Sequence, residues 1–180
     1  MRQTRLLALL VVLVLVATGV AFGQNAYMKG NNLVHAGIGF GLAGLYGSSS
    51  LPPITAGFEY GFEDKISLGG MVGYAGSKET FFGGEWKYTY IIIGARGAYH
   101  FLENNDKLDA YGGVMLGYNI VSTSASSSVS GFGFTASASG SYMIFGLFGG
   151  ARYYFSPKFG VYGEVGYGVG FLNVGVEFKL

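Results

Sequence analysis

The sequence contains no cysteine. It therefore has no disulfide, no thiolate zinc site, no cysteine nucleophile and no lipidated lipoprotein cysteine. Charged residues are also scarce, at 12% of the 180 residues, which is about half the share usual in globular domains. The formal net charge of +1 gives no indication of a nucleic-acid partner. These shortages exclude several classes of function, and they predict a surface that is poorly suited to water.

Proline is rare, with three residues, whereas glycine is abundant, with 33. Each glycine in a helix interior costs about 1 kcal/mol relative to alanine, so this glycine content disfavours helices. Half of the residues are hydrophobic and 17% are aromatic. The composition therefore favours an apolar protein built from β-strands.

The first 23 residues form a separate segment. Arg2 and Arg5 precede an apolar run over 6–16, and small residues follow as far as Gly23. This layout is typical of a cleaved secretory signal peptide, with Gly23 as the predicted cleavage position and Ala21 as an alternative. An uncleaved membrane anchor is the competing interpretation, but no basic stop follows the run. The predicted organisation is a signal peptide over 1–23, a short lead over 24–32 and a β-barrel domain over 33–180.

The remainder of the chain alternates between apolar and small or polar residues, with the period of a β-strand. In the last run Leu172, Val174 and Val176 share one parity, while Asn173 and Glu177 belong to the other. Eight such runs are predicted, at 33–42, 54–62, 66–75, 88–101, 108–121, 142–155, 159–168 and 172–180. Short polar turns at 63–65, 103–107 and 156–158 alternate with longer loops at 44–53, 76–86 and 122–141. This asymmetry of connections is typical of bacterial outer-membrane barrels.

Aromatic residues of the apolar parity gather at both ends of the predicted strands. Those at the short-turn end are Tyr60, Phe62, Tyr99, Phe101, Tyr153, Phe155 and Phe178, and those at the loop end are Phe40, Tyr74, Tyr118 and Tyr167. At a rise of about 3.3 Å per residue and a tilt of about 40°, the eight residues between the two groups cover about 20 Å. This is close to the height of the lipid-facing band of an outer-membrane barrel, so we interpret the two groups as aromatic girdles.

The opposite parity mixes glycines with a few large polar residues, which an eight-stranded barrel would enclose. The charged members predicted to lie inside are Glu59, Arg96, Arg152, Glu164 and Glu177. Because an unpaired charge in a dry interior is costly, we expect acids and arginines to pair and to hold the barrel together. A gated ion path through the same network is the alternative.

The chain from Leu33 to Leu180 resembles the small outer-membrane barrels of the OmpA and OmpX type. The resemblance rests on the segments Gly-Ala-Arg-Gly-Ala-Tyr-His-Phe at 94–101 and Gly-Gly-Ala-Arg-Tyr-Tyr-Phe at 149–155, and on a last strand similar to the family's assembly signal. The family usually ends in phenylalanine, whereas this chain ends in Leu180. The resemblance implies insertion by the outer-membrane assembly machinery, and we expect no peptidoglycan-binding domain after the last strand.

Some small barrels are enzymes that act at the outer rim, and this alternative needs a histidine near the loops. Only two histidines are present. His100 belongs to the short-turn end, His35 is predicted to face inward, and the spacing places no serine and acid beside either of them near the loops. A nucleophile needs its base within about 3 Å. We therefore expect no enzyme, no cofactor and no metal site.

The serine-rich segment 122–141 offers a different alternative, namely recognition at the cell surface. The fifth and sixth strands could continue through it as a protruding hairpin, with Phe132 and Phe134 near its tip as possible contacts. An exposed strand edge can bind a partner by adding a strand. A mobile loop without a ligand is the competing interpretation.

The sequence thus predicts an all-β protein, an eight-stranded antiparallel up-and-down transmembrane β-barrel that follows a cleaved signal peptide. The expected location is the bacterial outer membrane, and the expected role is structural, with a packed interior and exposed loops. A loop-mediated adhesin or resistance factor is the first alternative, and a narrow ion channel comes next. The expected partners are outer-membrane lipid and lipopolysaccharide, the assembly machinery during insertion, and a surface protein ligand at the loops.

Overall fold

The computed structural model describes residues 25–45, 47–81, 84–103, 105–129 and 132–180. The predicted signal peptide over 1–23 lies outside these residues. Eight strands follow one another along the chain: β1 (Asn32–Leu42), β2 (Ser48–Glu63), β3 (Ile66–Phe81), β4 (Gly84–His100), β5 (Leu108–Val129), β6 (Phe132–Tyr154), β7 (Phe159–Tyr167) and β8 (Gly170–Lys179). Among the described residues, no helix is long and apolar enough to cross a membrane.

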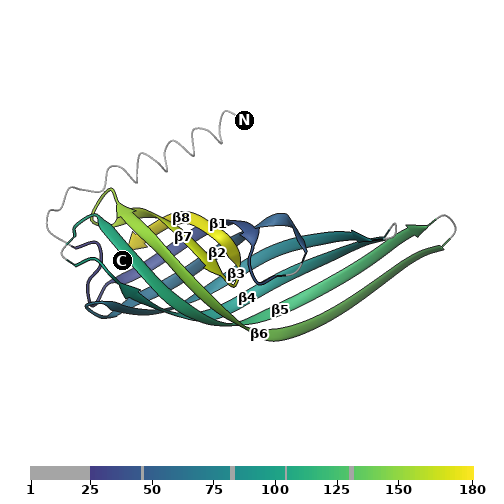
Figure 1. The fold of residues 1–180 in the computed structure, drawn as a ribbon, viewed down its shortest axis with the longest axis horizontal. Coiled ribbons are helices and arrows are strands. Elements are labelled where there is room, and N and C mark those ends of the chain that lie inside the picture. Colours follow the sequence, from purple (N-terminus) through teal and green to yellow (C-terminus); the bar gives the residue numbers. More distant parts are fainter. Residues whose placement is uncertain (1–24, 46, 82–83, 104, 130–131) are drawn as a thin grey trace, which may run out of the picture.

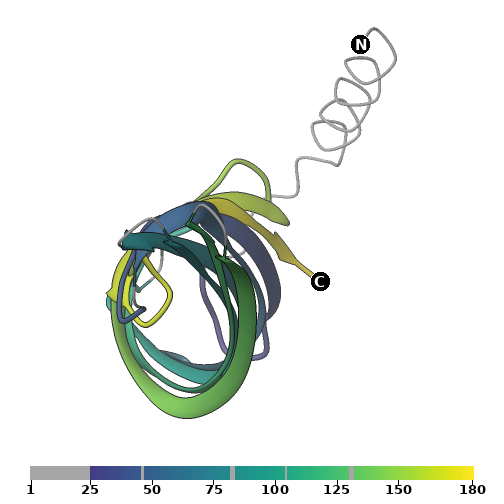
Figure 2. The same cartoon turned by 90° about the vertical axis from the view of Figure 1, so that its right-hand side faces the viewer.

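Each strand pairs with its sequence neighbours, and β1 pairs with β8, so the sheet closes into a barrel (Figures 1 and 2). All eight pairings are antiparallel. Around the closed ring each strand has a hydrogen-bonded neighbour on both sides, which is the condition for a sheet to span a lipid bilayer. The predicted all-β, up-and-down barrel is therefore confirmed.

Strands β3 to β6 extend far beyond the barrel as a protruding sheet (Figure 1). The predicted loop over 76–86 was wrong, because β3 continues to Phe81 and β4 begins at Gly84. Most of the serine-rich segment 122–141 is also strand, since β5 continues to Val129 and β6 begins at Phe132. Both extensions lie outside the barrel, so their sequences lack the apolar parity that identified the other strands.

The predicted loop over 44–53 was wrong in its second half, because β2 begins at Ser48. The pairing of β2 with β3 is irregular on both sides of Leu51, near Pro52 and Pro53. The register of β1 with β2 ends at the pair Ile38 and Ile54, so β1 does not pair with this part of β2. Proline has no N–H to donate and is tolerated on such an edge.

The outer surface of the barrel is apolar on every strand. One exposed residue from each strand in turn is Ile38, Ile54, Val72, Ile93, Leu116, Leu147, Val165 and Val174. Charged residues of the barrel wall, such as Arg152 and Glu59, instead point inward and are buried. The barrel is therefore inverted relative to a soluble protein, with hydrocarbon outside and charge inside, as a transmembrane barrel requires.

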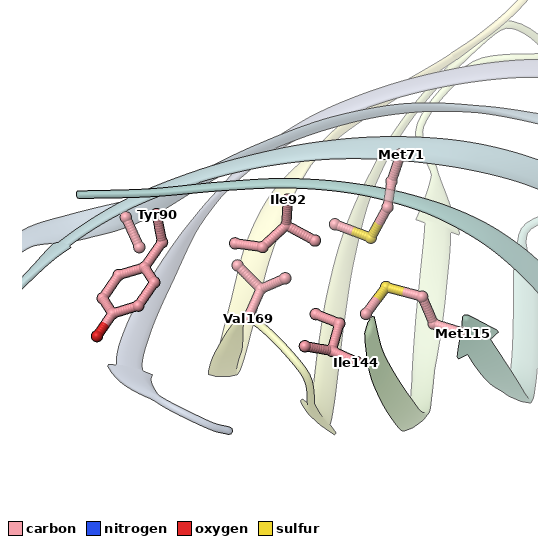
Figure 3. Packing of buried hydrophobic residues seen from close by; sticks show 7 residues of the cluster. Met71, Tyr90, Ile92, Met115, Ile144 and Val169 are labelled. Carbon is pink, nitrogen blue, oxygen red and sulfur yellow. The ribbon is translucent and has the colours of Figure 1, made fainter. Parts of the chain in front are cut away.

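An apolar layer lies inside the barrel towards the protruding sheet (Figure 3). Val169, on the connection between β7 and β8, points inward and meets side chains from β3 to β6. The buried residues of this layer are Met71, Ala75, Tyr90, Ile92, Met115, Ile144 and Val169. Gly168, with a φ of 135°, permits the backbone conformation that brings Val169 into the mouth. Met71, Met115 and Val169 border the same cavity as Arg96 and Glu164, so the layer adjoins the charged interior.

Candidate functional site

The centre of the barrel holds a cluster around the guanidinium group of Arg152, which is 2% exposed. Its Nη2 donates to Glu59 Oε2 at 2.7 Å, and its Nε lies 3.1 Å from Glu177 Oε2. Asp109 Oδ2 lies 3.6 Å from Nη1. These residues come from β6, β2, β8 and β5, so one cation connects strands on different sides of the barrel.

A second ion pair lies nearer the apolar layer. Arg96 Nη2 donates to Glu164 Oε2 at 2.5 Å, and the Tyr111 hydroxyl donates to the same oxygen at 3.2 Å. The Arg96 guanidinium also stacks 3.9 Å from the centre of the Phe148 ring. Beside this pair is a cavity of about 20 Å³ that is also lined by Asn173. Such a volume suits about one water molecule.

The structure thus brings together the five charged residues singled out as interior. Arg96 pairs with Glu164, and Arg152 contacts Glu59 and Glu177. The glycines of the same parity leave room for these large side chains. At Gly150, for example, an added Cβ would lie 2.9 Å from the Tyr111 hydroxyl.

Sequence reasoning missed a hydrogen-bonded group at the short-turn end. His100 Nε2 lies 2.9 Å from Ser67 Oγ, and its Nδ1 lies 2.9 Å from the Asp109 carboxylate. The inward parity of β5 includes Asp109, so the alternation could have identified it. The order serine, histidine, acid is that of a hydrolase triad. However, each of these side chains is only 1% exposed, and Glu59 Oε1 lies 3.7 Å from His100 Nε2.

The described residues of the predicted lead (24–32) cover this group at the short-turn end of the barrel. The Tyr27 ring stacks on the His100 ring, with 3.4 Å between centroids and 5° between planes. The Tyr27 hydroxyl donates to the carbonyl oxygens of Glu63 and Ile66, at 2.9 and 2.6 Å. Burial, reinforced by the negative charge of Glu59, raises the pKa of Tyr27. The lead therefore covers the short-turn end. Among the described residues, Ser67 is buried, so its hydroxyl is not exposed to a substrate.

Further contacts hold the lead in place. Asn25 accepts a hydrogen bond from Lys179 Nζ at 3.0 Å, and the Ala26 amide donates to the carbonyl of Asn105 at 2.6 Å. At the surface, Lys29 forms an ion pair with Glu63 at 2.9 Å, and this contact raises the pKa of Lys29. The lead thus contacts the last strand, the β4–β5 connection and the β2–β3 turn.

His35, the other histidine, faces inward and is 8% exposed. Its ring meets Tyr162 edge to face at 5.6 Å, and among the described residues neither ring nitrogen has a hydrogen-bond partner. Across the same part of the chain, no group of three histidine or acidic side chains is arranged to hold a metal ion. The described interior side chains form a packed polar network.

The residues interpreted as aromatic girdles lie on the outer surface. Ten of them are at least 42% exposed: Phe40, Tyr60, Phe62, Tyr74, Tyr99, Phe101, Tyr118, Tyr153, Phe155 and Tyr167. Phe178 is half-buried, with Lys158 Nζ 5.8 Å from the centre of its ring. These ten rings therefore point outward, which is the orientation that membrane-interface girdles need.

The protruding sheet has an open edge on β6. Pairing of β6 with β7 extends only from Tyr154 to Leu147, whereas β6 pairs with β5 as far as Phe132. The edge from Phe132 to Gly146 therefore has a neighbouring strand on one side. No charged residue and no proline occurs between Asp109 and Arg152. The side chains of Phe132 and Phe134, the possible loop contacts, lie outside the described part of the structure.

The opposite edge of the protruding sheet is different. As far as the pair Ser48 and Lys78, the first residues of β2 flank β3 and form this edge, and Pro52 and Pro53 have no backbone N–H group to donate. Edge strands commonly carry proline, bulges or charge, which prevent pairing with another chain. The β2 edge has such protection, and the β6 edge lacks it.

No protein-family model matches the chain, and no curated protein matches it in sequence. Solved structures do match. Ail, the attachment invasion locus protein of Yersinia pestis, aligns with a TM-score of 0.50 and 16% identity over 84% of this chain and 96% of Ail. Ail in complex with the heparin analogue sucrose octasulfate aligns with a TM-score of 0.51 and 17% identity, over the same shares of both chains.

The N-terminal β-barrel domain of Pseudomonas aeruginosa OprF aligns with a TM-score of 0.49 and 13% identity, over 85% of this chain and 98% of that domain. At these identities the likeness concerns the fold. The barrel topology, the apolar outer surface and the Ail alignments agree with the predicted resemblance. The chain has the fold of the small eight-stranded outer-membrane β-barrels.

Proposed function

We propose that the protein is an integral β-barrel of the bacterial outer membrane with a structural role in the envelope. The observation that carries this proposal is the inverted distribution of side chains, with an apolar exterior and paired charges inside. The interior network and the apolar layer around Val169 disfavour the narrow channel. The barrel acts as a closed anchor in lipid, the assembly machinery inserts it, and the anchor holds the protruding sheet above the membrane.

Two measurements on one detergent-folded sample test this proposal. A folded barrel should migrate differently on an SDS gel before and after boiling, because its closed sheet resists the detergent until it is heated. The same sample should give no steady conductance in a planar bilayer. Solubility without detergent together with unchanged mobility would contradict a membrane barrel, whereas stable conductance would favour the channel.

We further propose that the protruding sheet binds an extended segment of another protein by adding it to the open edge of β6. The contrast between the two edges favours this second function, because only the β2 edge carries prolines. The fold shared with Ail, which is described as an attachment protein, is consistent with a surface-binding role. Backbone hydrogen bonds would supply affinity, and neighbouring side chains would supply selectivity.

A matched pair of double variants tests strand addition. Ser137→Lys with Ser139→Lys places two charges on the edge strand, and Ser124→Lys with Ser122→Lys places them on the cross-strand partners in β5. Cells that display each variant would be compared for adhesion to protein-coated surfaces. The β6 variant should lose adhesion, and the β5 variant should retain most of it. Equal adhesion by both variants and the unmodified protein would refute the role of the edge.

A further inference from the structure

The outer face of β3 to β5 changes from apolar to polar between two neighbouring cross-strand rows. The last apolar row contains Tyr74, Ile91 and Ile120, which are 42, 44 and 39% exposed. The next row away from the barrel contains Thr89, Ser122 and Ser139. This boundary marks where the protruding sheet leaves the hydrocarbon (Figure 1).

Two lysines occupy the following row. Lys78 and Lys87 are direct cross-strand partners, and both are exposed. Like charges directly opposite each other destabilise a sheet, so this arrangement needs a compensating anion. Glu85 Oε1 lies 2.9 Å from Lys87 Nζ and compensates one charge. Among the described side chains, Lys78 has no carboxylate within ion-pair distance, although, in addition to the larger effect of Lys87, it lies close enough to Glu85 to lower the pKa of that carboxyl.

Ser124, the cross-strand partner of Lys87, lines a shallow hollow. It has a volume of about 400 Å³, and the hydroxyl-bearing residues Thr89, Ser122, Ser124, Ser137 and Ser139 line it together with Thr123 and Ala138. A hydroxyl group can both donate and accept hydrogen bonds, as sugar hydroxyls do. The hollow therefore combines the polar groups that suit a sugar with adjacent positive charge.

The position of this face relative to lipid is set by strand geometry. Lys87 is four residues from Ile91, or about 13 Å along the strand and about 10 Å along the barrel axis at a 40° tilt. Lysine side chains can also reach towards an interface along their methylene groups. The ammonium groups thus lie at the level of lipid headgroups, directly above the apolar row.

We propose that this face binds the phosphorylated sugar headgroup of an outer-leaflet glycolipid. Lys78 and Lys87 contact its phosphate, the serine and threonine hydroxyls contact its sugar, and its acyl chains lie against Ile91, Ile120 and the apolar band below. The proposal rests on the placement of the barrel in an outer membrane, and it assigns the headgroup to this side of the barrel. The surface is separate from the backbone edge of β6.

The test uses the whole protein in phosphatidylcholine nanodiscs that contain diphosphoryl lipid A, dephosphorylated lipid A or phosphatidylglycerol. Retained lipid is counted by native mass spectrometry after release from the disc. The unmodified protein should retain diphosphoryl lipid A in preference to both other lipids. The double variant Lys78→Gln with Lys87→Gln should lower this retention about tenfold, because charge-assisted contacts to the phosphate are lost.

The matched control is Lys107→Gln with Lys158→Gln, which removes two exposed lysines at the opposite end of the barrel and should leave retention unchanged. Equal loss in both double variants, or equal retention of phosphatidylglycerol, would overturn the glycolipid site. Ser122→Ala with Ser139→Ala should weaken retention of both forms of lipid A, and unchanged retention would remove the sugar contact. Failure of the protein to enter nanodiscs would instead contradict the proposed membrane placement.

Discussion

The barrel and the protruding sheet are made from the same strands, yet they use charge in opposite ways. Inside the barrel, Arg152 and Arg96 are almost fully buried and contact carboxylates. In the sheet, the long hairpin of β5 and β6 is rich in serine, threonine, alanine and glycine. No charged residue occurs in the hairpin between Asp109 and Arg152, which both lie in the barrel. The comparison teaches that buried charges hold the barrel together, whereas the hairpin depends mainly on backbone pairing.

The largest expected effect comes from removing the central cation. Arg152→Met should destabilise the barrel by about 3–5 kcal/mol, because Glu59, Glu177 and Asp109 would be left buried without it. Unfolding by urea in detergent or lipid vesicles measures the change. Lys107→Met, which removes an exposed lysine from a turn, should change the midpoint little. A loss no greater than that of Lys107→Met would mean that the interior charges do not hold the barrel.

A charge on the outer surface of the barrel should have the next largest effect. Leu116, on β5, is 54% exposed in the apolar band. Leu116→Lys should cost about 2–4 kcal/mol, as for lysine near the middle of a bilayer. The same unfolding assay in lipid vesicles measures it. Wild-type stability for this variant would show that Leu116 does not face hydrocarbon.

The lead should contribute less than either feature of the barrel wall. Tyr27→Ala should cost about 2 kcal/mol, because stacking on His100 and hydrogen bonds to two carbonyl groups are lost. Tyr27→Phe keeps the ring and should recover roughly half of this cost, since only the hydroxyl is absent. Hydrogen exchange at the short-turn end should rise in Tyr27→Ala. Unchanged exchange there would contradict a sealing role.

The smallest effect is expected in the protruding sheet. Ser124 lies on the same strand and the same outer face as Leu116, but beyond the apolar band. Ser124→Lys should cost no more than about 1 kcal/mol, because the position is exposed and the only new penalty is the like charge of Lys87 on the facing strand. A cost similar to that of Leu116→Lys would place the membrane boundary further out than the row of Thr89 and Ser122.

Alternation predicted the barrel because each of its strands has lipid on one side and packed side chains on the other. The same rule failed over 76–86 and 122–141, where the sheet stands outside the barrel and no apolar parity is imposed. The inward parity of β5 would have identified Asp109. The contact of Tyr27 with His100 could not be foreseen, since the lead has no periodicity. Likewise, which acid meets Arg152 depends on the stagger of strands around the ring.

The pairing of β1 with β8 determines when the barrel can be completed. Leu33 pairs with Lys179, so the ring closes only after nearly the whole described chain is available. The entropic cost of bringing such distant strands together must be met before their contacts form, and such long-range pairing slows folding. Until then β1 and β8 each present a free edge that can capture another chain. Ring closure therefore competes with aggregation during folding of this protein. A chaperone that binds either terminal strand would favour the native barrel.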